Sequence, residues 1–221
     1  MSNILLELKV SFCPPPTTSF GSKRAIGEER TVQFFEGLST FFSSVMPICR
    51  DHGVDVYILD NTLPGIEHLD KRIRKIIPDD VEVIFNKKNF WGKFNNGAGD
   101  IDGWRDQVDR ISRYDWFVHH EPRLEIISPY FFDSFLNDNR ELFKVSSNNQ
   151  KSQFWTGTFA CKTSSLVTFM ESMDLLRMVQ DSVSIEYAMY DFFASSSPSF
   201  STIDKIDVVW KDGATGERHV C

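Results

Sequence analysis

The chain has 221 residues, of which 41% are hydrophobic and 25% charged, values typical of one sizeable folded domain rather than a disordered chain. Its formal net charge of −7 and the lack of a Lys/Arg tract argue against a nucleic-acid partner. No segment of the sequence approaches the roughly 20 apolar residues of a membrane span. The four cysteines form no C-x-x-C pair, which argues against a zinc ribbon or a redox pair, and we expect a cytoplasmic protein without a disulfide framework.

The first half of the chain alternates predicted strands and helices. A proline-rich segment at 13–24 predicts irregular structure after the first strand, because consecutive prolines lack donors and fix the backbone. In chain order we predict a strand at 4–12, a helix at 31–50 that Pro47 kinks or ends, a strand at 54–62, a helix at 65–77, a strand at 81–86, a helix at 100–112 and a strand at 114–118. This order predicts a mostly parallel sheet flanked by helices.

The second half of the chain is less regular. Here we predict a short helix or aromatic turn at 129–136, strands at 143–147 and 154–162, helices at 164–180 and 184–193, a linker at 195–199 and an edge hairpin within 208–220. The helix at 164–180 is amphipathic, and its spacing places Leu166, Phe169, Met170, Met173 and Leu176 on the inner side.

The second predicted strand ends in two polar residues, Asp60 and Asn61. A carboxylate at the C-terminal end of a strand can accept hydrogen bonds from a ribose or from the imide of a uracil. The alternative is an Asx turn, in which these side chains bond to the neighbouring backbone.

A loop rich in glycine and asparagine, at 89–99, leads into the helix predicted at 100–112. Glycines would let the backbone approach a ligand, and the N-terminus of the following helix favours negative charge. The loop matches no standard phosphate motif, and its alternative is an ordinary strand-to-helix connection. The sequence Asp100-Ile101-Asp102 is a literal D-x-D, but we interpret it as helix capping. The candidate nucleotide-binding residues of the loop are Asn89, Gly92, Asn96 and Gly97.

The aromatic strand at 114–118 leads directly into the sequence HHEPR at 119–123. Because strand neighbours point to opposite faces, at most His119 and Glu121 face the same way. These two residues, with diphosphate oxygens and water, could hold Mn²⁺ or Mg²⁺. Arg123 could instead bind the diphosphate without a metal. The structural alternative is a Glu121–Arg123 ion pair beside a turn proline.

Two carboxylates, Glu186 and Asp191, lie in the predicted helix near the end of the chain. A general base must reach the proton of an acceptor hydroxyl, and the start of a helix near a cleft is a suitable position. The alternative is a capping box, in which Ser184 and the acids that follow it satisfy the first turn of the helix.

These motifs follow one another in the order seen in GT-A glycosyltransferases, especially the family 2-like bacterial enzymes. The segment 55–61 (DVYILDN) resembles their second strand, 86–97 (NKKNFWGKFNNG) their Asn/Gly loop, and 114–123 the strand that has their D-x-D-type acid. The segment 154–162 (FWTGTFACK) resembles their acceptor-side strand, and 184–191 falls where the catalytic base belongs. The chain departs from the family at the D-x-D position, which reads HEPR, and in the long proline-rich loop after the first strand.

The resemblance implies a single GT-A-like domain at 1–221, with a nucleotide-binding half at 1–125 and an acceptor half at 126–221. It implies transfer of a sugar, UDP-linked in our expectation, to a saccharide hydroxyl. The implied roles are Asp60 and Asn61 for the nucleotide, Arg123 for the diphosphate, His119 and Glu121 for Mn²⁺ or Mg²⁺, Trp155 for the acceptor sugar, and Glu186 with Asp191 for catalysis. Two alternatives remain open: a GT-A-shaped binding or scaffold protein without turnover, and a nucleotidyltransferase-like enzyme, although the glycine-rich signature of the latter is missing.

Overall fold

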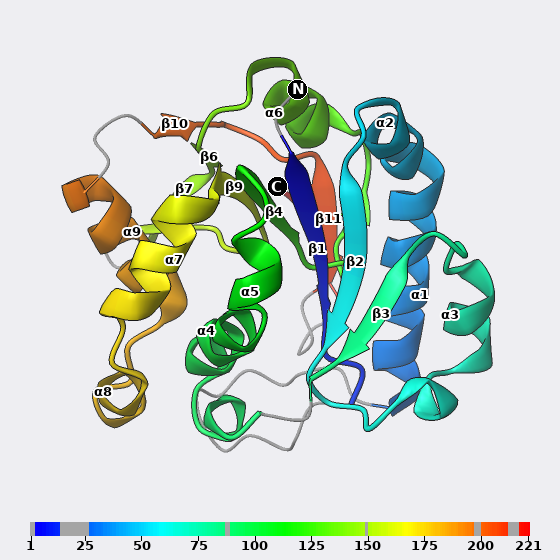
Figure 1. Cartoon of the computed structure of the whole chain (residues 1–221), viewed down its shortest axis with the longest axis horizontal. Coiled ribbons are helices and arrows are strands. Elements are labelled where there is room, and N and C mark those ends of the chain that lie inside the picture. The colour runs from blue at the N-terminus through cyan, green and yellow to red at the C-terminus, as the bar shows by residue number, and fades with distance from the viewer. Residues whose placement is uncertain (1–2, 14–26, 87–88, 149, 197–199, 212–216) are drawn as a thin grey trace.

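The computed structural model describes residues 3–13, 27–86, 89–148, 150–196, 200–211 and 217–221. At its centre lies a seven-stranded sheet, mostly parallel, with the strand order β10-β6-β9-β4-β1-β2-β3 (Figure 1). Only the pairs that involve β9 are antiparallel within this sheet. Its strands are β1 (Ile4–Val10), β2 (Asp55–Asp60), β3 (Glu82–Phe85), β4 (Trp116–His120), β6 (Leu142–Phe143), β9 (Thr158–Lys162) and β10 (Ser201–Thr202).

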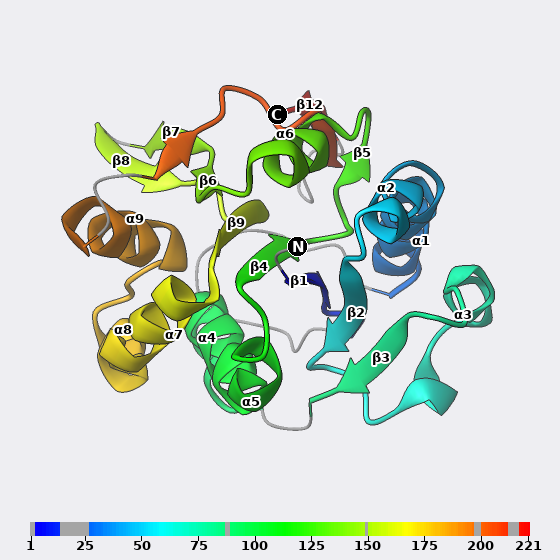
Figure 2. The same cartoon turned by 45° about the horizontal axis from the view of Figure 1, so that its top comes forward.

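Helices cover both faces of the sheet, as Figures 1 and 2 show. One buried cluster joins the sheet to α1 (Gly27–Ser44), α2 (Met46–Asp51), α3 (Lys71–Ile76) and α6 (Tyr130–Asp138). The other joins it to α4 (Asn96–Asp106), α5 (Val108–Ile111), α7 (Thr163–Ser172), α8 (Leu175–Gln180) and α9 (Ile185–Ser196). The predicted α/β class with a mostly parallel, helix-flanked sheet is therefore confirmed.

Short elements complete the described part of the chain. They are the 3₁₀ helices η1 (Ile66–His68) and η2 (Trp91–Lys93), and the strands β5 (Glu125–Ile126), β7 (Val145–Asn148), β8 (Lys151–Phe154), β11 (Val208–Lys211) and β12 (Arg218–Val220). β11 pairs with β12 and β5, and β7 pairs with β8, all antiparallel. The predicted edge hairpin and the antiparallel part of the second half are thus present. Within the described residues, no helix has the length and apolar character needed to cross a bilayer.

β1 is an interior strand of the sheet, between β4 and β2, and all seven of its side chains are buried. The even-numbered residues, such as Leu6 and Leu8, pack in the cluster with α1. Leu5 packs in the opposite cluster, with α4. Because strand residues alternate between faces, Glu7 and Lys9 follow Leu5 on the α4 side. β1 therefore has one aliphatic face and one face that becomes charged toward its C-terminal end.

The order in which strands are added to the sheet reverses at β1. β2 and β3 lie on one side of β1, and β4 lies on the other (Figure 2). At such a switch, the loops that leave the C-terminal ends of the two neighbouring strands diverge and open a crevice, which is where open α/β sheets bind ligands. The topology therefore points to the ends of β1 and β4 as the place to look for a site.

Several predicted helices are interrupted. The helix expected at 31–50 is two helices, because Pro47 falls in the first turn of α2, where a missing N–H costs nothing. The helix expected at 164–180 breaks before α8, whose N-cap Asp174 accepts a hydrogen bond from the backbone N–H of Arg177. Leu176 is 51% exposed there, so the prediction that it faces inward was wrong.

Other sequence predictions concern residues beyond the described ranges. Most of the proline-rich segment (14–24), the middle of the linker (197–199) and the turn of the edge hairpin (212–216) lie outside them. The strand predicted at 154–162 is two strands, β8 and β9, which are separated by a turn.

A glycine of α1 allows that helix to touch the segment that follows β4. A Cβ on Gly37 would lie 1.7 Å from the carbonyl oxygen of Pro122, between Glu121 and Arg123. We expect Gly37→Ala to lower the free energy of unfolding by about 1–3 kcal/mol, the usual cost of overpacking. Urea unfolding measures this loss.

Gly103→Ala is the matched control, because Gly103 also lies in a helix. Its Cβ would come no closer than 3.6 Å to another group, an ordinary contact. This variant should gain up to about 1 kcal/mol from helix propensity. If Gly37→Ala were as stable as Gly103→Ala, α1 and the 121–123 segment would not be in close contact.

Candidate functional site

A cavity of about 270 Å³ lies at the C-terminal ends of β1, β2 and β4, where they meet the N-termini of α4 and α9. It occupies the crevice that the strand order indicates. Eight of the residues singled out in the sequence line it: Asn61, Asn89, Gly92, Asn96, Gly97, Glu121, Arg123 and Glu186. Segments that are far apart in the chain thus meet at one space, with amide, carboxylate and guanidinium groups facing it.

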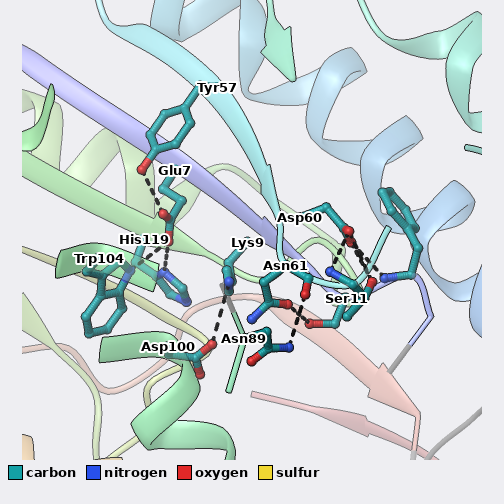
Figure 3. A network of polar contacts seen from close by, with 12 residues as sticks. Glu7, Lys9, Ser11, Tyr57, Asp60, Asn61, Asn89, Asp100, Trp104 and His119 are labelled. Carbon is teal, nitrogen blue, oxygen red and sulfur yellow. Dashed lines mark hydrogen bonds and ion pairs between the residues drawn. The ribbon is translucent and has the colours of Figure 1, made fainter. Parts of the chain in front are cut away.

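Asp60 is not among the lining residues. Its side chain, labelled in Figure 3, is fully buried. Its carboxylate accepts hydrogen bonds from the backbone N–H groups of Phe12 (3.0 Å), Thr62 (2.7 Å) and Leu63 (2.5 Å). This is the Asx-turn arrangement considered for the sequence. Asp60 therefore joins the end of β1 to the end of β2, and the neighbouring Asn61 is the residue that faces the cavity.

His119 also lies away from the cavity, in the layer beneath it. Its Nδ1 is 3.0 Å from the carboxylate of Glu7, its strand partner in the parallel β1–β4 pairing. Its ring stacks on Phe159 and meets Trp104 edge-on. The side chain is only 3% exposed, and it is not among the residues that line the cavity. The structure thus separates His119, which is buried in β4, from Glu121, which follows the end of β4 and lines the cavity.

His120 points to the opposite face of the sheet. There its ring stacks on Phe41, and its Nδ1 is 2.8 Å from the hydroxyl of Thr158. Burial lowers the pKa of His120 to about 3, so the ring is neutral near pH 7. This histidine belongs to the core with α1.

Trp155 and Asp191 are likewise outside the cavity. Trp155 is partly buried and packs against the cluster around α1, and its neighbour Thr156 lines the cavity. Asp191 lies on α9 one turn beyond Glu186, but its side chain is 62% exposed and pairs with Lys151 at 3.5 Å. Of the two predicted catalytic carboxylates, only Glu186 faces the cavity.

The glycines of the loop serve protein packing. A Cβ on Gly92 would lie 1.9 Å from Oδ1 of Asn89, and one on Gly97 would lie 2.6 Å from Cβ of Ile185. The first glycine allows Asn89 to fold back, so that its Nδ2 donates to the carbonyl of Asn61 at 3.1 Å. The second brings α4 and α9 together at the cavity wall. These two glycines thus allow close packing within the protein, against Asn89 and against α9.

α4 begins four residues earlier than predicted, and this changes the role of Asp100. The N-cap is Asn95, whose Oδ1 accepts a hydrogen bond from the N–H of Ala98 and whose Nδ2 donates to the carbonyls of Met178 and Val183. The interpretation of Asp100 as a capping residue was therefore wrong. It lies in the second turn, lines the cavity, and its carboxylate is 3.9 Å from Nζ of Lys9.

Three carboxylates of the cavity differ in their surroundings. Burial raises the pKa of Asp100 to about 6; the Lys9 ammonium opposes this shift and the charge of Glu121 adds to it. Burial would also raise the pKa of Glu121, but the guanidinium of Arg123, which donates a hydrogen bond to it, and the other nearby cations bring it to about 2. The Glu121–Arg123 pair that the sequence left open is thus present. Glu186 belongs to a different element, α9, and its charge helps to raise the pKa of Arg123.

The sequence interpretation missed Lys9 and Arg30. Lys9 occupies a polar position near the end of the first strand, and Arg30 lies in the first turn of α1, where its Nε donates to the carbonyl of Ser11 at 3.0 Å. Both are buried and both line the cavity. The sequence did contain a signal for Lys9, namely a lysine near the C-terminal end of a predicted strand. Lysine is rarely buried unless its charge has a partner, so a lysine at this position indicates a candidate binding site.

A divalent metal does not fit the described residues well. Glu121 is bonded to Arg123, His119 is bonded to Glu7, and Asp100 has an ammonium beside it. In the described parts of the chain, no group of three His, Cys, Asp or Glu side chains is arranged to hold a metal ion. Mg²⁺ needs only one or two carboxylates when phosphates complete its shell, but here each carboxylate of the cavity floor already has a cationic neighbour.

No protein-family model and no curated protein matches the sequence. Several solved structures are similar to it. A protein from Desulfovibrio desulfuricans G20, provisionally named a nucleotide-diphospho-sugar transferase, is 10% identical, with a TM-score of 0.54 over 92% of this chain and 80% of that chain. A cytidylyltransferase from Leptospira borgpetersenii serovar Hardjo-bovis (strain JB197) is 13% identical, with a TM-score of 0.46 over 91% of this chain and 74% of that chain.

A 4-diphosphocytidyl-2C-methyl-D-erythritol synthase from Anaerococcus prevotii DSM 20548 is 8% identical, with a TM-score of 0.48 over 92% of this chain and 89% of that chain. At such identities a likeness concerns the fold alone, and of these three structures we base that conclusion on the one from Desulfovibrio. This chain has an α/β fold like that of the nucleotide-diphospho-sugar transferases.

Proposed function

We propose that this protein transfers a sugar from a nucleoside-diphosphate donor to a saccharide hydroxyl. One observation supports this more than any other: the crevice between β1 and β4 combines cationic side chains with a separate carboxylate, Glu186. Of the described residues that line it, three are cationic: Lys9, Arg30 and Arg123. A diphosphate needs such cations, and a hydroxyl nucleophile needs a base.

In this proposal the donor lies across the ends of the central strands. Asn61 and Asn89, which are joined by a hydrogen bond, hold the nucleoside part near the end of β2. Asn96 and Gly97, at the N-terminus of α4, face the phosphates, because the free N–H groups of a first helical turn attract negative charge. The fold of the nucleotide-diphospho-sugar transferases supports this placement by analogy. The choice of UDP and the family 2-like assignment rest on the sequence resemblance.

The reaction would form a bond between the acceptor oxygen and the anomeric carbon, and would break the bond from that carbon to the diphosphate. The diphosphate leaves with the electron pair, and the cations of the cavity stabilise its charge. Glu186 takes the proton of the acceptor hydroxyl in an inverting reaction. The acceptor sugar would lie near Thr156, which lines the cavity and directly follows Trp155 in the sequence.

Nucleotidyl transfer is the second candidate. Its nucleophile is a phosphate oxygen, which is already deprotonated near pH 7 and needs no base. The observation that favours it is the group of three cationic side chains, which would suit two phosphorylated substrates in one cavity.

Isothermal titration with UDP, CDP, GDP and ADP, followed by product analysis with the matching nucleotide sugars and nucleoside triphosphates, tests both candidates. We expect binding of at least one nucleoside diphosphate, and release of that diphosphate from the sugar donor. Release of pyrophosphate from a triphosphate would favour nucleotidyl transfer instead. Binding without turnover of any donor would leave a scaffold, and no binding of any nucleotide would contradict the donor site altogether.

A further inference from the structure

Lys9 is the most unusual group in the cavity. Its side chain is 4% exposed, and its ammonium has no hydrogen-bond partner among the described residues. The nearest opposite charge is the carboxylate of Asp100, at 3.9 Å, which is too long for a hydrogen bond (Figure 3). A buried ammonium is costly unless it is paired and hydrogen-bonded, so an arrangement of this kind calls for a further anionic partner.

The surroundings hold Lys9 in this position. Below it on the same face of β1 lies Glu7, whose carboxylate receives three hydrogen bonds of its own and is therefore already satisfied. Beside it lies Gly103 of α4, where an added Cβ would be 3.6 Å from Nζ. Nζ of Lys9 therefore lies within van der Waals distance of the α4 backbone at that position. Lys9 thus points at the space that the ligand would occupy.

Arg123 lines the same cavity from the segment that follows β4, and its side chain is 45% exposed. The nearby carboxylates Glu121, Asp100 and Glu186 raise its pKa, which keeps the guanidinium charged. Only its Nε is bonded to Glu121 in the described contacts, and a guanidinium has further N–H groups for a phosphate. An ammonium and a guanidinium from neighbouring strands thus face one space.

We propose that Lys9 and Arg123 replace the divalent metal of the expected donor site, so that this protein binds its nucleoside diphosphate without Mn²⁺ or Mg²⁺. This inference rests on the proposed function. As the bond between the anomeric carbon and the phosphate oxygen breaks, the electron pair stays on that oxygen, and the two cations stabilise the added charge. No proton has to be transferred to the leaving diphosphate. Two observations support the replacement. The described residues include no suitable set of metal ligands around Glu121, and an ammonium lies beside Asp100.

Binding of UDP, or of whichever diphosphate binds best, is measured by isothermal titration after treatment with EDTA, and again with added Mn²⁺ or Mg²⁺. We expect the two dissociation constants to agree within about threefold, because the cations that replace the metal belong to the protein. Lys9→Met should weaken binding in EDTA by about tenfold or more, and Lys9→Arg should restore part of it.

Lys93→Met is the matched control, since Lys93 is an exposed lysine of η2, next to the cavity-lining Gly92, that does not itself line the cavity. It should bind within about twofold of the wild-type protein, as expected for a screened surface charge. Circular dichroism checks that the Lys9 variants fold. The comparison with and without EDTA uses the wild-type protein, so it remains informative even if a variant fails to fold. Binding that EDTA abolishes and Mn²⁺ restores would overturn the inference but not the donor site. A diphosphate that fails to bind under either condition would overturn both.

Discussion

Replacing Glu186 with glutamine is expected to lower the turnover of sugar transfer by about 10²–10⁴-fold, the usual contribution of a general base. Glutamine has nearly the same shape but cannot accept the proton of the acceptor hydroxyl. Donor binding should change little, because the cations that would hold the diphosphate lie on other elements. Steady-state kinetics with saturating donor, together with titration of the nucleoside diphosphate, would separate the two effects.

Asp191→Asn is the matched control for this experiment. Asp191 lies on the same helix, but it is exposed and pairs with Lys151 outside the cavity. Its removal should alter turnover by no more than about twofold, since exposed ion pairs contribute little. Full activity of the Glu186→Gln variant would indicate that the nucleophile is already deprotonated, as in the nucleotidyl-transfer alternative.

Replacing Glu7 with alanine should have the largest effect on stability, a loss of about 3–5 kcal/mol in the free energy of unfolding. The fully buried carboxylate accepts hydrogen bonds from the hydroxyl of Tyr57 (2.7 Å) and Nε1 of Trp104 (2.9 Å), and it lies 3.0 Å from Nδ1 of His119 (Figure 3). Alanine would leave these groups without their acceptor in the core. For a chain of this size the melting temperature should fall by roughly 10 °C, at about 2–4 °C per kcal/mol.

Two controls accompany the Glu7 variant. Asp80→Ala removes an exposed partner of Arg50 and should cost about 0–1 kcal/mol. Glu7→Gln keeps an acceptor oxygen and should lose less than Glu7→Ala. If Glu7→Ala cost no more than Asp80→Ala, the buried network would not contribute to folding.

The Glu7 network also predicts a dependence on pH. Burial alone would raise the pKa of Glu7, but its hydrogen bond and electrostatic interaction with His119, helped by Lys9 and Trp104, lower it below the ordinary value of 4.5. The stabilisation is therefore complete above that value and is lost as the pH falls through the lowered pKa. The stability difference between the wild-type protein and Glu7→Gln should accordingly shrink in acid, as urea unfolding at several pH values would measure.

Periodicity in the sequence was sufficient to predict the first four strands of the sheet and their order with the helices. The same alternation placed His119 and Glu121 on one face, and His120 on the other. It could not predict that Glu7, 112 residues away, would bind His119 and keep it from the cavity. Contacts of that kind depend on which strands become neighbours, and no local pattern encodes them.

Two other errors have local causes. Asp100 was assigned to the start of a helix because acids favour first turns, but the side chain of Asn95 caps the helix first. Asp60 was expected to contact a ligand, whereas three backbone donors surround its carboxylate. In both cases the residue type indicated a polar role, but the sequence did not show where the side chain points. A carboxylate at a strand end has two possible partners, backbone or ligand, and only the loop geometry decides between them.

The two charged residues of β1 have a consequence for folding. In the observed register, Leu5 lies opposite Asp55 of β2 and Phe117 of β4. A shift of β1 by one residue would turn Glu7 and Lys9 toward the aliphatic cluster with Leu38. Burial of unpaired charges there would cost several kcal/mol for each ion. We therefore expect Glu7 and Lys9 to select the correct pairing of β1 with β2 and β4 while the sheet assembles.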